Sequence, residues 1–343
     1  MSVNLTDGVA VVNSVREMLS PLMQASIPVA NIDNIGEVGA PILQWSELAN
    51  AFYTNLTNLI GMTYVEYRTW QNPLSMFKRG DQVLGDGIRE IAINFTDEED
   101  YNVAGTDLLN TKKPDLKVCY HRVNRQKKFS VTNIEAELEM AFTSWDNFGT
   151  LVSRIVENLY RSNEVAEYQW TKATILSAIN DEAIPSVEAT FPEDEASGKA
   201  FTKAVRALSE KFTFPSTSYN AYNKSTASDK NFATFTPKDQ QVLIITPEAL
   251  ASLDVDVLAV AFHMDKAEFL GRVVVMDDLG TESNAPFAML CDSAFVKIWE
   301  KKRYFNSFLN PDNMSLKSYL HVWQTYGYSP FANAVVFKPA VNA

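Results

Sequence analysis

A stripe of apolar residues between positions 146 and 180 constrains this chain more than any other feature of its sequence. Asp146 is an expected N-cap, and Pro185 lies just beyond the expected end. The pattern predicts one helix of about 50 Å at about 1.5 Å per residue, or two shorter helices broken near Ser162 and Asn163. The apolar positions, which recur at helical spacing, are Phe148, Val152, Ile155, Leu159, Ala166, Trp170, Ala173 and Leu176.

A single helix of that length is unusual for a chain of 343 residues. A compact globule of this size has a radius of gyration of about 20 Å, so the helix would cross nearly the whole molecule. The sequence therefore predicts a flat or elongated subunit built on a spine helix.

Residues 1–44 are interrupted by Pro21, Pro28 and Pro41. Because proline lacks a backbone donor and disfavours helix interiors, we expect an extended arm with at most one short helix near residues 11–19. The arm contains enough apolar side chains to predict that it lies on another surface.

A charge-free run follows from Leu48 to Val65. Its apolar face has helical spacing, and its opposite face carries only amides and hydroxyls. Such a face suits contact with another protein, where an unpaired charge would be costly to bury; the alternative is a helix packed on its own core. The run is too polar to span a membrane, and the N-terminus does not resemble a secretory signal. The apolar positions are Trp45, Leu48, Phe52, Leu56 and Leu59.

Residues 81–133 have the pattern of a long β-hairpin with a polar tip at residues 97–111. Ile91, Ile93 and Phe95 alternate with smaller or polar residues, as in a half-buried strand. The return strand places Leu116, Val118 and Tyr120 on one side and Lys117, Cys119 and His121 on the other.

Charge is segregated along this hairpin, with acids on the outgoing side and bases on the return side. The two sets either neutralise each other, which contributes little at an exposed surface, or dock onto neighbouring copies. The candidate contact residues are Asp97, Glu98 and Glu99 on the acidic side, Lys117, Arg122, Arg125, Lys127 and Lys128 on the basic side, and Trp45 and Phe52 on the preceding helix.

The rest of the chain has an α/β pattern that returns to β structure at the C-terminus. Expected strands cover residues 242–245, 273–275, 288–291, 317–326 and 334–337. Expected helices cover residues 199–211, 257–262 and 295–299, and a further one begins at Pro247 behind the N-cap Thr246.

No local motif indicates catalysis, a cofactor or a metal. The sequence contains no phosphate loop and no zinc-protease signature, and His121, His263 and His321 are isolated from one another. Cys119 and Cys291 are expected to be small buried hydrophobic residues. Asp277 and Asp278 follow a valine-rich strand, where a strand-end turn is expected and a metal site is the alternative. The net charge of −12 excludes a uniformly basic nucleic-acid wrapper.

The order of these parts resembles the major capsid proteins of tailed bacteriophages with the Hong Kong ninety-seven type fold, small podophages in particular. The stretch SYLHVWQTYGYSPFANAVVF at 318–337 looks like the end of such proteins. QVLIITPEAL at 241–250 and AVAFHMDKAEFLGRVVVMDDL at 259–279 look like their axial domain, except that His263 replaces the family's common asparagine.

The resemblance implies an α+β subunit of an icosahedral head that encloses double-stranded DNA without reading its sequence. The implied partners are further copies as pentamers and hexamers, a scaffolding protein and a portal, with assembly in the host cytoplasm and a final place in the virion. The implied segments are 1–62 for the N-terminal arm and helix, 63–133 for the extended loop and its flanking strands, 134–182 for the spine helix of the peripheral domain, 183–300 for the axial domain, and 301–343 for the return to peripheral strands. The alternatives are an encapsulin-type compartment shell and a soluble α/β enzyme with an acidic site at Asp277 and Asp278.

Overall fold

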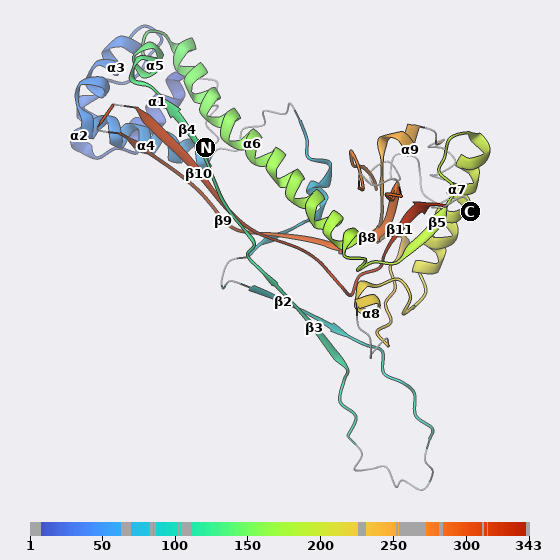
Figure 1. Ribbon diagram of the computed structural model, residues 1–343. Coiled ribbons are helices and arrows are strands. Elements are labelled where there is room, and N and C mark those ends of the chain that lie inside the picture. The colour runs from blue at the N-terminus through green and yellow to red at the C-terminus, as the bar shows by residue number, and fades with distance from the viewer. Residues whose placement is uncertain are drawn as a thin grey trace. The chain divides into compact units, whose positions relative to one another are not determined.

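A computed structural model describes most of the chain (Figure 1). The described residues are 8–62, 70–82, 85, 87–101, 103, 111–225, 231–251, 253, 272–280, 284–310, 312–313 and 315–340. They divide into two compact units. Unit 1 comprises Met1–Asn72, Arg125–Glu167 and Glu300–Gln324, and unit 2 comprises Pro73–Asn124, Tyr168–Trp299 and Thr325–Ala343.

The predicted long helix is confirmed as one continuous element, α6 (Trp145–Asn180), drawn in green in Figure 1. Its 36 residues correspond to about 54 Å. The alternative of two helices broken near Ser162 is wrong. The N-terminal cap is Ser144, whose Oγ accepts a hydrogen bond from Asn147 N at 3.2 Å, so Asp146 lies in the first turn instead.

The prediction of an extended N-terminal arm is wrong for the described residues. They form helices α1 (Gly8–Glu17), α2 (Pro21–Ser26) and α3 (Ile35–Gln44), followed by α4 (Ser46–Met62). Pro21 is the first residue of α2, where no backbone donor is needed. Pro41 lies inside α3, but that helix buries Val38 and Ile42, and such packing outweighs the local preference.

Unit 1 has a single apolar core, in which the N-terminal helices pack together. Helices α1 and α3 both contact α4, and the core also includes residues of α6 and of three strands. These strands are β4 (Arg125–Asn133), β9 (Val296–Leu309) and β10 (Leu316–Tyr328), which belong to a sheet of order β1-β9-β10-β4, where β1 is Lys78–Asp81. The short helix α5 (Glu135–Ala141) follows β4.

Substitutions of two glycines in α3 can show how closely this helix packs in the core of unit 1. A Cβ at Gly39 would lie 2.5 Å from Cβ of Phe142, whereas one at Gly36 would meet nothing within 4 Å. We expect Gly39→Ala to lower the free energy of unfolding by about 1–3 kcal/mol. Gly36→Ala should raise it by about 0.5–1 kcal/mol, because alanine favours a helix. Urea unfolding of both variants checks this, and equal effects would contradict the close approach.

Unit 2 is built on a sheet of order β5-β11-β8-β6-β7, formed by β5 (Ser186–Ala189), β6 (Gln241–Ile245), β7 (Val273–Val275), β8 (Ala288–Asp292) and β11 (Ala334–Pro339). Alternate residues of its strands enter two different cores. One core includes Ile175 and Ile179 of α6, and the other includes Phe201 and Val205 of α7 (Glu195–Phe212). The sheet is therefore covered on both faces, which explains why its strands are short apolar runs.

Most of the elements expected in unit 2 are confirmed. Thr246 precedes α9 (Pro247–Ala251), as the Thr-Pro pair predicts. The short 3-10 segments are η1 (Pro73–Phe77) and η2 (Lys238–Gln240), and α8 is Ala221–Ser225. The prediction of a helix at 295–299 is wrong, because residues 296–299 belong to β9 and residue 295 directly precedes it. The helix expected at 257–262 and His263 lie outside the described residues. Among the described helices, none has the length and apolarity that a membrane crossing requires.

Candidate subunit interface

The first candidate surface is a two-stranded antiparallel ribbon of β2 (Gly87–Ile93) and β3 (Leu116–Arg122). The predicted alternation along both strands is confirmed: the side that carries Ile91, Val118 and Tyr120 is exposed, and the opposite side is half-buried in β2 and buried or half-buried in β3. The exposed side, called here the apolar ribbon face, is between 43% and 67% accessible at each large side chain. Its members are Ile91, Ile93, Phe95, Leu116, Val118 and Tyr120. A contiguous apolar surface of this kind marks an interaction site.

The opposite side of the ribbon is bound to the rest of unit 2 through Glu90. Its carboxylate accepts hydrogen bonds from His121 Nε2 at 2.9 Å and from Ser329 Oγ at 2.7 Å. Lys297 forms an ion pair with the same carboxylate. The His121 ring packs 5.2 Å from the ring of Trp299. The partner of His121 is thus Glu90 on the neighbouring strand, which the spacing of the two residues in sequence does not indicate.

These contacts decide the ionisation of Glu90. Burial alone would raise its pKa, but the hydrogen bonds from His121, Lys297 and Ser329 and the charge of Lys297 lower the pKa to about 2. The position of the His121 ring requires a glycine at residue 327, because a Cβ atom there would lie only 2.6 Å from Nδ1 of His121. The base of the ribbon is thus held by an ionised, almost enclosed carboxylate.

The predicted contact residues before the ribbon belong to the interior of unit 1. Phe52 is fully buried, with its ring 6.1 Å from that of Phe142, and Trp45 is partly buried against the same core. The polar face of α4 also bonds within this unit, since Asn50 Oδ1 accepts a hydrogen bond from Leu309 N at 3.0 Å. This geometry favours the alternative of a helix packed on its own core.

The basic residues predicted for the hairpin divide into separate groups. Lys117 is buried, with Nζ 3.1 Å from Asp115 and 5.6 Å from the centre of the Tyr222 ring. Arg122 ends β3 and is exposed. Lys127 and Lys128 are also exposed, but they lie on β4, which pairs with β10. The predicted hairpin of residues 81–133 therefore ends at β3.

Arg125 is an interior residue of unit 1, so its placement on the hairpin edge is wrong. Its guanidinium is fully buried and donates hydrogen bonds to Gln324 Oε1 and, at 3.0 Å, to Asn163 Oδ1. Glu167 closes this network, because its Oε1 accepts hydrogen bonds from Asn163 at 2.7 Å and Gln324 at 2.8 Å. Arg303 lies 3.4 Å from the same oxygen. Polar contacts in the interior thus join β4, α6, β9 and β10. Because these segments are far apart in sequence, the contacts could not be predicted from local patterns.

The acidic residues at the start of the hairpin tip are exposed. Lys112 forms an ion pair with Glu99 at 2.8 Å and donates a hydrogen bond to Asp97 O, also at 2.8 Å. In the described part of the chain, the carboxylates of Asp97, Glu98 and Asp100 form no ion pair. The charge neutralisation proposed within the hairpin is thus only partial.

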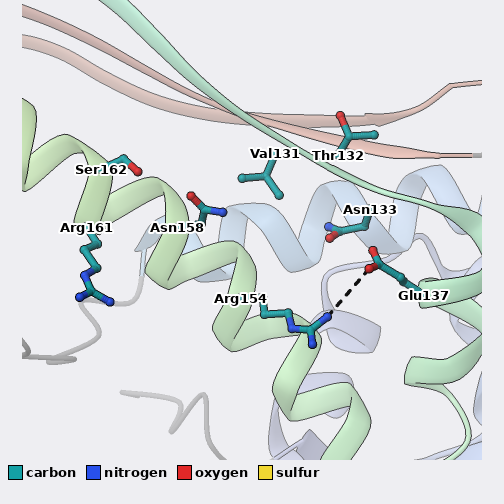
Figure 2. A pocket seen from close by; sticks show the side chains of 8 residues that line it. All are labelled: Val131, Thr132, Asn133, Glu137, Arg154, Asn158, Arg161 and Ser162. Carbon is teal, nitrogen blue, oxygen red and sulfur yellow. Dashed lines mark ion pairs between the residues drawn. The ribbon is translucent and has the colours of Figure 1, made fainter.

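A pocket of about 450 Å³ lies between the end of β4, the start of α5 and α6 of unit 1 (Figure 2). Figure 2 shows Arg154 directed at Glu137, with Nη1 of the arginine 3.9 Å from Oε1 of the glutamate. Arg161 points away from that pair. The lining residues are Val131, Thr132, Asn133, Glu137, Arg154, Asn158, Arg161 and Ser162. All of these side chains except Val131 carry polar groups.

Asp277 and Asp278 share one lysine of α6, Lys172, as their ion-pair partner. Lys172 Nζ lies 2.7 Å from Asp277 Oδ2 and also pairs with Asp278, and Tyr168 donates a hydrogen bond to Asp277. Burial opposes the charge of Lys172, but the hydrogen bonds and charges of both aspartates raise its pKa. Within the described residues, no cluster of three His, Cys, Asp or Glu side chains is arranged to hold a metal ion.

Comparison with known proteins identifies the family to which this chain belongs. The model of the Phi29-like phage major capsid protein family matches residues 12–338. The chain belongs to this family. It is a major capsid protein of the tailed-phage head, a structural protein of the virion shell and not an enzyme. This family membership does not favour the alternative of an encapsulin-type compartment shell.

Relatives and solved structures agree with this assignment. The chain is 32% identical over 339 residues to the major capsid protein of Bacillus phage PZA, covering 98% of this chain and 74% of that protein. It is 27% identical to the major capsid protein of Streptococcus phage Cp-1, covering 94% of this chain and 91% of that protein. The capsid structure of Staphylococcus phage Andhra matches with a TM-score of 0.62 at 15% identity, over 81% of this chain and 88% of that one. The expected phage capsid fold, with mixed helices and sheets, is confirmed.

Proposed function

We propose that this capsid protein assembles with further copies, as pentamers and hexamers, into a closed icosahedral shell around double-stranded DNA. A scaffolding protein and a portal are the proposed assembly partners, and the host cytoplasm is the proposed place of assembly. The shell contacts the packaged DNA without reading its sequence. An acidic subunit suits this task, since a net charge of −12 does not trap a polyanion.

The observation that carries self-assembly is the apolar ribbon face. Its side chains are exposed in the single chain, although each would contribute roughly 1 kcal/mol or more if a neighbouring copy covered it. The contacts of the Glu90 carboxylate hold the other side of the ribbon against the rest of unit 2, so the apolar side is exposed. Identical contacts repeated around closed symmetry are collectively strong even when each is weak.

Successive parts of the chain are proposed to have different roles in the shell. Residues 1–62 form the N-terminal arm and helix, and 63–133 the extended loop with its flanking strands. Residues 134–182 are the spine of the peripheral domain, 183–300 form the axial domain around the symmetry centres, and 301–343 return to peripheral strands. The candidate contacts Arg122, Lys127 and Lys128 and the acids at 97–99 remain exposed and available to neighbouring copies.

Removing apolar surface from the ribbon tests the proposal. We expect Val118→Thr combined with Tyr120→Thr to raise the protein concentration needed for assembly at least about tenfold, since about 1.4 kcal/mol of lost contact energy suffices. Sedimentation of the co-expressed capsid and scaffolding proteins measures this.

A matched variant controls for the loss of apolar surface elsewhere. Val187 and Phe214 are also exposed, at 38% and 67%, but lie outside the ribbon. Replacing both with threonine should leave assembly near the wild-type level. Equal assembly by the ribbon variant and this control would remove the ribbon face from the subunit contacts.

A further inference from the structure

A second surface, on unit 1, combines lysines with aromatic rings. Alternate residues of β10 place Tyr319, His321 and Trp323 on the side opposite the buried Leu320 and Val322. Neighbouring strands extend this side, because His321 is in register with Lys128 of β4. The surface, called here the cation–aromatic face, consists of Lys128, Lys302, Tyr304, Phe308, Tyr319, His321 and Trp323.

The lysines of this face are held against rings. Lys128 Nζ lies 5.4 Å from the centre of the Tyr319 ring, and Lys302 Nζ lies 5.3 Å from Trp323 and 5.4 Å from Tyr304. In the part of the chain that the structure describes, neither lysine forms an ion pair with a carboxylate. Cation–π contacts orient an ammonium group without neutralising it, so the face presents fixed positive charge beside aromatic surface.

The same chain carries a segment with the complementary character. Residues 95–101 place the exposed carboxylates of Asp97, Glu98 and Asp100 between two aromatic side chains. Phe95 is 54% exposed and Tyr101 is 90% exposed. Acidic groups flanked by aromatic rings match lysines flanked by aromatic rings in both charge and apolar character.

We propose that the cation–aromatic face of one copy binds the acidic segment 95–101 of a second copy. This inference rests on the proposed shell assembly, and it names the two surfaces that meet when one copy binds another. Identical copies supply face and segment in equal numbers, which suits repeated contacts in a closed assembly. Nucleic acid is a less suitable occupant, because the chain carries a net charge of −12 and a phosphate backbone is bound through an excess of cations.

Charge reversal and its rescue test the pairing. We expect Lys128→Glu with Lys302→Glu, co-expressed with scaffolding protein, to lower the yield of shells at least about tenfold, because like charges would then meet at the contact. Asp97→Lys with Glu98→Lys and Asp100→Lys should lower it similarly. A chain that carries both sets should recover most of the yield, a result that misfolding of either variant would not produce.

Further measurements separate the possible outcomes. Lys203→Glu with Lys224→Glu, exposed lysines of unit 2, makes the same change in net charge and should leave the yield near wild type. Failure of rescue, or full assembly by the face variant, would overturn the pairing while wild-type assembly still upholds the shell. Normal shells with lowered DNA content would overturn it in favour of a nucleic-acid contact. If the wild-type protein forms no shells, the proposed function itself fails.

Discussion

Replacing Arg125 by alanine is expected to lower the free energy of unfolding by about 3–5 kcal/mol, the usual cost of removing one member of a buried ionic network. The side chain is fully buried, and its guanidinium bonds Gln324 and Asn163, which in turn bond the buried carboxylate of Glu167. Without Arg125, Gln324 and Asn163 stay buried and lose their charged donor, while Glu167 keeps its ion pair with Arg303. Chemical denaturation followed by circular dichroism measures the change.

The same strand provides a matched control. Lys127 is two positions further along β4 but exposed, so Lys127→Ala should change stability by no more than about 0.5 kcal/mol. If the two alanine variants are equally stable, Arg125 does not hold unit 1 together as described.

Glu90→Gln is expected to destabilise the protein by about 3 kcal/mol at pH 7, because the pKa of Glu90 falls from 4.5 to about 2 on folding. A carboxyl group with a lowered pKa stabilises the fold at pH values above its ordinary pKa. That contribution is lost as the pH falls from about 4.5 to about 2, where the carboxylate becomes protonated. The difference between wild type and Glu90→Gln should therefore shrink across this window.

Unfolding experiments at pH 7, 4 and 2.5 on both proteins check this pH dependence. Glu188→Gln, which alters an exposed glutamate of β5, should match wild type at every pH. A difference between wild type and Glu90→Gln that stays constant with pH would show that lost packing, and not lost charge, causes the destabilisation.

Elements with a long or simple periodic pattern were predictable from sequence. The helix α6 shows its apolar stripe over 36 residues, so no single residue decides the prediction. The buried strands β6, β8 and β11 are short apolar runs because both faces of their sheet are covered. A short apolar run also gave a wrong prediction. Residues 295–299 were expected to be helical but lie in β9 or just before it.

Local rules failed where tertiary packing decides the conformation. Prolines predicted an extended arm, yet Pro21 starts a helix and Pro41 lies within one that buries Ile42. Alternation predicted the two sides of the ribbon but not which side faces solvent. That depends on Glu90 and on Lys297, which is 207 residues away in sequence.

The candidate contact residues were predictable only in part, for the same reason. Charge segregation drew attention to the acids at 97–100, which are exposed, but it grouped the buried Arg125 with exposed bases, because its partner Gln324 is 199 residues away. The cation–aromatic face was missed because its members come from three strands that pair only in the folded chain. The aromatic alternation along residues 317–326 was its only local signal.

Electron cryomicroscopy of particles assembled from this protein, with the proposed scaffolding protein present, is the sharpest test of the proposed subunit contacts. We expect a closed shell in which the apolar ribbon face of each copy is covered by an adjacent copy. Closed shells in which Ile93, Val118 and Tyr120 stay exposed to solvent would contradict it, as would a protein that remains monomeric under all assembly conditions.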